Sequence, residues 1–198
     1  PDSSAAQVQD VFHVTLHRLR RALGAPEWIL YRGEAYVFNR RLPFWYDVAE
    51  FQSLWQAAGR SLRTAPQEAL ERYRQATALY QGDFQGESAA EWALPVQRQL
   101  AAAYEESLRS LARLHLQRAE LKEAVACYEQ LLGRDYYREE IHRELMRAYA
   151  LLGQAGKAQD HYRRLRRRLH DELDVAPEEA TQALCQSLRA GQPVRDLA

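Results

Sequence analysis

The chain has 198 residues, of which 46% are hydrophobic and 27% charged, a composition typical of a globular protein. Its 27 basic and 27 acidic side chains give a formal net charge of zero, so overall charge is no argument for nucleic-acid binding, and only local patches can supply one. The two cysteines do not suggest a disulfide framework, and no apolar run approaches the ~18 residues that span a bilayer. We therefore expect a cytoplasmic protein with no membrane segment.

The first predicted element is a helix over residues 5–23. Apolar residues recur there at three- and four-residue steps and form one stripe: Val8, Phe12, Leu16, Leu19 and Leu23. Gly24 is typical of a residue that ends a helix. Two short β-prone runs follow within residues 28–38, on either side of a turn at Gly33, and this pattern predicts a β-hairpin. No other part of the sequence gives a convincing strand signal.

Beyond about residue 46 the pattern is helical throughout. One helix is expected to begin at Asp47, and a second to begin at Pro66 and run to about Tyr80. Pro95 is expected to mark a break or a restart in the long helix that follows. This helix and the later ones are predicted at residues 88–118, 121–132, 138–152, 155–173 and 177–190. Residues 191–198 are expected to form a flexible tail, and the predicted fold class is mainly α.

A 34-residue repeat is the most informative feature of the sequence. The offset relates these pairs: Ala124 and Ala158, Tyr128 and Tyr162, Leu131 and Leu165, Leu111 and Leu145, and His115 and Tyr149. An earlier copy is expected at Ala69 and Tyr73. Helix pairs at this period are typical of TPR proteins, in which neighbouring pairs bury faces that no pair can bury alone. The repeat predicts a TPR-like right-handed stack of antiparallel helix pairs. The alternative is a generic helical bundle with chance alanine spacing.

The first 41 residues carry local charge that the zero total hides. Between Val11 and Leu23 there are arginines and histidines but no acidic residue. With the apolar stripe turned inward, we expect His13, His17, Arg20 and Arg21 to share the outward face. Arginine can pair with guanine edges or phosphates, and histidine and threonine can hydrogen-bond to either. The candidate DNA-binding residues are His13, Thr15, His17, Arg18, Arg20 and Arg21 on the helix, and Arg32 at the hairpin tip. The alternative is an ordinary solvated face.

A second basic run places five arginines within residues 163–168. Two interpretations stay open for it: a solvated face that is salt-bridged to Asp171, Glu172 and Asp174, or a contact with DNA or RNA polymerase. The histidines show no metal-ligand spacing, and no nucleophile motif or glycine-rich phosphate loop is present. We therefore expect no metal, no cofactor and no enzymatic activity.

Several of these segments resemble known regulators. Residues 14–24 resemble the recognition helix of response-regulator-type winged-helix proteins, and the hairpin around Gly33 and Tyr36 resembles their wing, with Ala35 in place of the usual glycine. Residues 47–51 are similar to the start of the bacterial transcriptional activator domain. The closing part of that domain resembles residues 143–146, 162–165 and 172–178. In this order, over nearly the whole chain, the segments resemble SARP-type regulators, in which a winged helix is fused to that domain.

The resemblance implies a DNA-binding regulator that activates transcription. Its expected partners are double-stranded promoter DNA and, through the TPR-like domain, RNA polymerase or another protein, with a homo-oligomer left open. The TPR-like domain is expected to serve oligomerisation, effector sensing or polymerase contact. Residues 1–41 would be the C-terminal part of the winged helix, with recognition helix 5–23 in the major groove and wing 28–38 on the backbone, and residues 47–190 the activator domain. The strands and two helices that open the family's winged helix are expected upstream of Pro1. Without them the apolar stripe would pack on the helical domain or remain exposed. The alternative is a TPR-type protein–protein interaction scaffold that binds no DNA.

Overall fold

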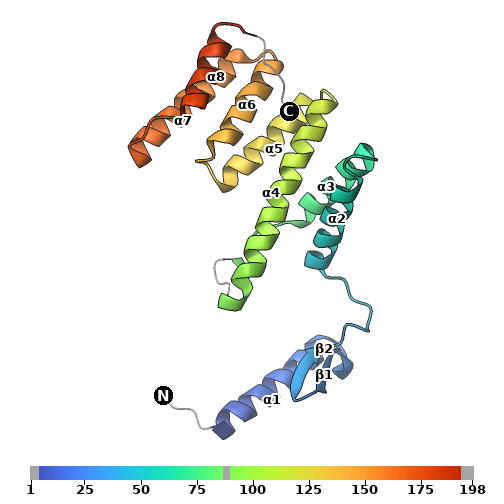
Figure 1. Cartoon of the computed structure of the whole chain (residues 1–198). Coiled ribbons are helices and arrows are strands. Elements are labelled where there is room, and N and C mark those ends of the chain that lie inside the picture. Colours follow the sequence, from blue (N-terminus) through green and yellow to red (C-terminus); the bar gives the residue numbers. More distant parts are fainter. Residues whose placement is uncertain (1–4, 87–89, 193–198) are drawn as a thin grey trace. The chain divides into compact units, whose positions relative to one another are not determined.

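The structure, a computed structural model, describes residues 5–86 and 90–192 (Figure 1). The chain separates into two compact units, Pro1–Tyr46, here called the N-terminal unit, and Asp47–Ala198, here called the helical unit. Each is described by itself. The described residues form eight α-helices and one two-stranded sheet, so the predicted mainly-α class is confirmed.

The N-terminal unit consists of one helix followed by a hairpin. Its elements are α1 (Ala5–Ala22), the 3-10 turn η1 (Pro26–Trp28), β1 (Ile29–Arg32) and β2 (Ala35–Phe38). The strands are antiparallel, with Arg32 opposite Ala35 at the closed end. The two turn residues, Gly33 and Glu34, both have positive φ angles, 56° and 63°. Such a turn matches the right-handed twist of the strands, so this hairpin closes tightly, as the sequence predicted.

The helical unit contains all the remaining helices. They are α2 (Asp47–Ser61), α3 (Pro66–Leu79), α4 (Leu94–Gln117), α5 (Leu121–Arg134), α6 (Glu139–Leu151), α7 (Ala155–Leu173) and α8 (Glu179–Arg189), with the 3-10 turn η3 (Glu91–Ala93) before α4. Each helix packs against the next one along the chain, and α8 also contacts α6 (Figure 1). Short connections between packed neighbours favour antiparallel pairs.

One predicted boundary was wrong. The helix expected from residue 88 begins at Leu94, but the restart expected at Pro95 is confirmed, because Pro95 lies in the first turn of this helix. Proline fits there because its missing N–H would have no helical partner at that position, and its fixed φ suits the helix. Residues 87–89 lie outside the described part of the chain, as do 193–198, most of the predicted tail.

The repeat positions form the core of the helical unit. The paired residues of α5 and α7 are all buried: Ala124, Tyr128, Leu131, Ala158, Tyr162 and Leu165. Ala69 and Tyr73, the expected earlier copy, are buried in α3. An alanine with no exposed surface, such as Ala124 or Ala158, lets two helix backbones approach closely, and the tyrosine fills the space beside it. The offset therefore reflects equivalent packing positions. Within the described residues, no helix is both long and apolar enough to cross a membrane.

Candidate nucleic-acid interface

The hairpin of the N-terminal unit is fastened to one side of α1. The Phe12 ring lies 5.1 Å from the ring of Tyr36, measured between centroids. Arg20 donates hydrogen bonds from Nη2 and Nε to the backbone oxygen of Ile29, at 2.7 and 3.3 Å, and its guanidinium lies 6.0 Å from the centre of the Tyr36 ring. Leu16 lies between these two contacts on α1. Among the described side chains of this helix, it is the one that is buried. These contacts fix which face of α1 stays free.

Most of the predicted DNA-binding residues lie on the free surface. His13, Thr15, His17, Arg18, Arg21 and Arg32 are all exposed. Among the described residues, none of these three arginines forms an ion pair with a carboxylate. The Thr15 hydroxyl donates to the backbone oxygen of Val11 at 2.7 Å, which leaves its oxygen lone pairs available as acceptors. Arg32 ends β1 beside the turn, as expected for a residue near the hairpin tip.

Arg20 departs from the prediction. It was expected on the outward face, but it is half-buried and its guanidinium is hydrogen-bonded to the hairpin. The reason lies in helix geometry. Arg20 follows Leu16 by four residues, so the two side chains lie one turn apart on the same face. Arg20 therefore positions the hairpin, and the outward basic surface consists of the other residues.

The apolar stripe of α1 is mostly uncovered. Leu16 is 7% exposed, whereas Val8 and Phe12 are 57% and 46% exposed and Leu19 and Leu23 are 44% and 36% exposed. Within the N-terminal unit these four side chains are exposed, and the expected choice between packing on the helical domain and exposure stays a prediction. The hairpin covers one side of the helix alone, and a solvent-facing stripe of this kind is typical of a surface that another element covers.

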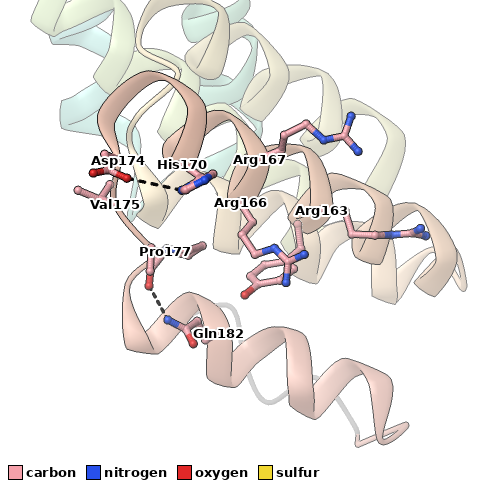
Figure 2. Close-up of a pocket in the computed structure, with 10 residues that line it drawn as sticks. Arg163, Arg166, Arg167, His170, Asp174, Val175, Pro177 and Gln182 are labelled. Carbon is pink, nitrogen blue, oxygen red and sulfur yellow. Dashed lines mark hydrogen bonds and ion pairs between the residues drawn. The ribbon is translucent and has the colours of Figure 1, made fainter.

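The second basic run, on α7, divides into paired and unpaired arginines. Arg168 forms an ion pair with Glu172 at 2.6 Å, as the salt-bridged interpretation predicted, whereas Arg163 pairs with Asp160, which lies before the run and was not among the expected partners. Asp174 lies 3.8 Å from His170 and pairs with no arginine in the described structure. Arg166 and Arg167 have no carboxylate partner among the described residues, and both line a groove beside α8 (Figure 2). The salt-bridged interpretation therefore covers only part of the run.

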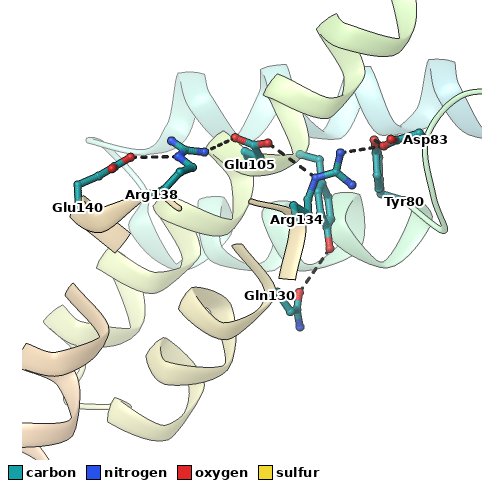
Figure 3. A network of polar contacts seen from close by, with 8 residues as sticks. Tyr80, Asp83, Glu105, Gln130, Arg134, Arg138 and Glu140 are labelled. Atoms are coloured by element: carbon teal, nitrogen blue, oxygen red, sulfur yellow. Dashed lines mark hydrogen bonds and ion pairs between the residues drawn. The ribbon is translucent and has the colours of Figure 1, made fainter. Parts of the chain in front are cut away.

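A polar network that the sequence analysis missed joins four segments of the helical unit (Figure 3). Arg134 contacts Asp83 at 2.8 Å and Glu105 at 3.7 Å, and Arg138 contacts Glu105 at 2.6 Å. The Tyr80 hydroxyl donates to Asp83 at 2.7 Å. This bond and the Arg134 guanidinium hold the pKa of the Asp83 carboxyl below its usual value. Residues 83 and 134 are 51 positions apart, so periodicity could not reveal the pair.

A second missed feature is a pair of buried histidines between α6 and α7. His142 Nδ1 and His161 Nε2 are 2.6 Å apart, and His142 Nε2 lies 2.6 Å from the backbone oxygen of Tyr136. A carbonyl oxygen only accepts, so His142 Nε2 carries the proton, and its Nδ1 accepts from His161 Nε2. Burial lowers the pKa of both rings, that of His161 to about 3. The pair is therefore neutral and structural at neutral pH. No group of three or more His, Cys, Asp or Glu in the described residues could hold a metal ion.

Comparison with known proteins supplies the family. No match was found among curated proteins. The fold is similar to that of the solved structure of Mycobacterium tuberculosis EmbR in complex with low affinity phosphopeptide, with a TM-score of 0.69 at 21% identity. That match covers 98% of this chain and 52% of the EmbR chain, so this chain spans about half the length of that relative. The family model of the bacterial transcriptional activator domain matches residues 46–189. The chain therefore belongs to the bacterial transcriptional activator domain family.

Proposed function

We propose that the protein is a DNA-binding transcription regulator, most simply an activator, with no enzymatic activity and a cytoplasmic location. The observation that carries the proposal is the free basic face of α1 beside a fastened hairpin, directly before a domain of the activator family. A helix presents base contacts in the major groove while a hairpin follows the backbone, which is how basic helices and wings divide the work in DNA recognition.

In this proposal the N-terminal unit is the C-terminal part of a winged helix. His13, Thr15, His17, Arg18 and Arg21 would approach the major groove, and Arg32 the adjacent phosphates. Arg20 acts differently. It donates to the Ile29 carbonyl and so sets the position of the wing against the recognition helix. The exposed apolar side of α1 would pack against the remaining elements of the winged helix, which would also remove the cost of leaving Val8 and Phe12 in water.

The helical unit would serve as the protein-binding and regulatory part. We infer a TPR-like right-handed stack, supported by the buried 34-residue equivalents Ala124 and Ala158 and by the family match. Such stacks use extended surfaces rather than enclosed pockets to bind partners. RNA polymerase or another protein, or a second copy of the chain, would bind there.

The test uses the intact protein encoded by the gene. A binding sequence is selected from a random double-stranded DNA pool, and its affinity is measured at several salt concentrations. A base-contacting arginine contributes roughly 1–3 kcal/mol, so replacing Arg18 and Arg21 with Ala should weaken binding to the selected sequence and relax its specificity, whereas Arg32→Ala, which removes a phosphate contact, should lower the salt slope of log K by about one. The matched control replaces Arg74 and Arg63, which are exposed arginines of the helical unit. Equal affinity of the Arg18→Ala/Arg21→Ala variant and the native protein would refute the proposal.

The second candidate function is a helical-repeat scaffold that binds a protein or peptide and no DNA. The balanced total charge and the uncovered apolar residues of α1 favour it, since apolar surface of this kind suits a protein partner. It predicts that selection enriches no DNA sequence and that the residual affinity for DNA is the same for every sequence tested.

A further inference from the structure

A groove lies between α7 and α8, and is closed at one end by residues 174–177 (Figure 2). Its volume is about 550 Å3, within the size range of small-molecule sites. It lies wholly within the helical unit and includes none of the residues assigned above to DNA. We call it the α7–α8 groove. Its lining combines Arg163, Arg166, Arg167 and His170 of α7 with residues 174–177 of the closing segment and Gln182 of α8.

One wall of the groove is a row of basic side chains. Arg163, Arg166, Arg167 and His170 stand at positions i, i+3, i+4 and i+7 of α7, so they are neighbours on one helix face. Like charges at these spacings destabilise a helix, and the nearby acidic residues relieve only part of the repulsion. Asp160 pairs with Arg163, and Asp174 lies 3.8 Å from His170. Arg166 and Arg167 line the groove and have no carboxylate partner in the described structure. A bound anion would supply the missing counter-charge.

The basic wall is specific to the last helix pair. The 34-residue offset places Glu129, Leu132 and Gly133 of α5 at the positions of Arg163, Arg166 and Arg167. In α5 the equivalent of Arg166 is thus a buried leucine, 7% exposed, that belongs to the core. The repeat therefore does not require arginine at these places. The last repeat of a stack needs a polar outer face, and neutral side chains such as glutamine would provide it. That need therefore does not explain a row of like charges.

The rest of the lining is apolar or neutral except for the Asp174 carboxylate, which lies 3.8 Å from His170. Val175, Ala176 and Pro177 form the closing segment, and Tyr162 lies beside the arginines at the base of the groove. The Gln182 side chain donates to the Pro177 oxygen at 2.7 Å, which ties α8 to this segment. Planar guanidinium groups suit phosphate oxygens in pairs, while the apolar segment suits the uncharged body of the same ligand. A continuous DNA duplex fits less well, because the groove has a volume of about 550 Å3 and is closed at one end by residues 174–177.

We propose that the α7–α8 groove binds a small phosphorylated molecule of the nucleotide class, with its phosphates on Arg166 and Arg167 and its uncharged part against the segment of Val175 and Pro177. The site gives the helical unit a place for an effector. The inference concerns the helical unit alone and goes beyond the proposed function, so its test uses no DNA, and its failure leaves the DNA-binding proposal intact.

The test measures binding to the full 198-residue chain by calorimetry, with ATP, AMP, adenosine and tripolyphosphate as probes. ATP is expected to bind more tightly than AMP, and adenosine not to bind, because the arginines hold the phosphates. Replacing Arg166 and Arg167 with Gln should weaken ATP binding by about tenfold or more, the scale of a lost charge-assisted hydrogen bond. ATP should also raise the melting temperature of the native chain but not of this variant.

The control is Arg164→Gln, which removes one positive charge from α7 outside the groove lining, and Arg166→Gln alone is the single-charge variant that matches it. Arg164→Gln should change ATP affinity by less than about twofold, because screening by salt leaves only weak long-range attraction. Absence of ATP binding at millimolar concentration, or equal binding by the Arg166→Gln/Arg167→Gln variant, would overturn the proposal. Tripolyphosphate binding as tight as that of ATP would overturn the nucleotide class. Tighter binding of a ten-residue glutamate peptide would identify a protein-docking surface instead.

Discussion

Arg20 and Ile29 are joined by a hydrogen bond of 2.7 Å from a guanidinium Nη2 to a backbone oxygen. Through this contact a side chain of α1 holds the first strand of the hairpin, and Phe12 and Tyr36 add a ring contact on the same side. The donor is the charged guanidinium of a half-buried arginine, so the bond contributes more to stability than a solvent-exposed polar contact does. It therefore decides how the hairpin and the free basic face of α1 are presented together.

Arg20→Ala should release the hairpin while leaving α1 helical. Loss of a charge-assisted hydrogen bond at a partly exposed position costs about 1 kcal/mol, which corresponds to roughly fivefold faster amide exchange when the hairpin opens locally. Hydrogen exchange of the amides of residues 29–38 measures this. The matched control is Arg18→Ala, because Arg18 is exposed and makes no ion pair with the described carboxylates. Unchanged hairpin exchange in Arg20→Ala would show that the contact does not hold the hairpin.

Arg134→Ala should destabilise the helical unit. The side chain is 25% exposed, pairs with Asp83, and lies 5.4 Å from the centre of the Tyr80 ring and 5.7 Å from that of Tyr104. The substitution removes a partly buried ion pair, whose contribution lies between those of surface and fully buried pairs, and it also removes the two cation–π contacts. We therefore expect the free energy of unfolding to fall by about 1–2 kcal/mol. Urea unfolding monitored by circular dichroism measures the change.

The control for the Arg134 prediction is Arg74→Ala. Arg74 pairs with Glu71 at 3.9 Å, and both side chains are more than half exposed. Such a pair contributes little, so the variant should stay within about 0.5 kcal/mol of the native protein. If both variants lose the same stability, the network of Arg134 has no special role in holding the helices together.

Because of the buried histidine pair, we expect acid to lower the stability of the protein at pH values well above the range in which carboxylates titrate. Burial lowers the pKa of His161 to about 3 from an ordinary value of 6.5. The unfolded chain therefore takes up a proton below pH 6.5 while the folded chain does not, so the stability from this group is present in full above pH 6.5 and is lost as the pH falls toward 3. Between pH 7.5 and pH 5.0 we expect the free energy of unfolding to fall by about 1–2 kcal/mol for His161.

His161→Gln should remove that part of the pH dependence. The measurement is urea unfolding at pH 7.5 and 5.0, and the variant should lose less stability than the native protein on acidification, whatever its stability at pH 7.5. His13→Gln is the matched control, because the His13 ring is exposed in the folded chain. A His161→Gln variant whose acid sensitivity equals that of the native protein would show that the pair does not titrate on unfolding.

Local patterns predicted the helices and the hairpin well, and the reason is physical. Burial repeats at the helical period, so positions such as Tyr128 and Tyr162 are recognisable from spacing alone, and both are buried. The hairpin was predictable because its turn contains Gly33, which accepts a positive φ. The helical pattern was extended too far back, to residue 88, whereas the proline signal at Pro95 marked the true start of α4.

The polar contacts were harder to predict, because they depend on three-dimensional neighbours. Arg20 belongs to two overlapping patterns, one with His13 and His17 and one with Leu16, and only packing of the hairpin decides between them. His142 and His161 are 19 residues apart on different helices, a spacing with no local signature. The free arginines of α7 could not be told from the paired ones, since that depends on which carboxylates each side chain reaches.

The most direct test of the central claim, that the free face of α1 lies against DNA, is site-directed disulfide crosslinking. The two native cysteines, Cys127 and Cys185, are both buried, so an introduced thiol is the accessible one. Val14 is 51% exposed and precedes Arg18 by four residues, which places Val14→Cys on the free face. In the intact protein, Val14→Cys should crosslink to selected DNA that carries a tethered thiol in the major groove, and Gln75→Cys, exposed on α3, should not. Crosslinking from Gln75→Cys but not from Val14→Cys, or equal yields from both, would contradict the account.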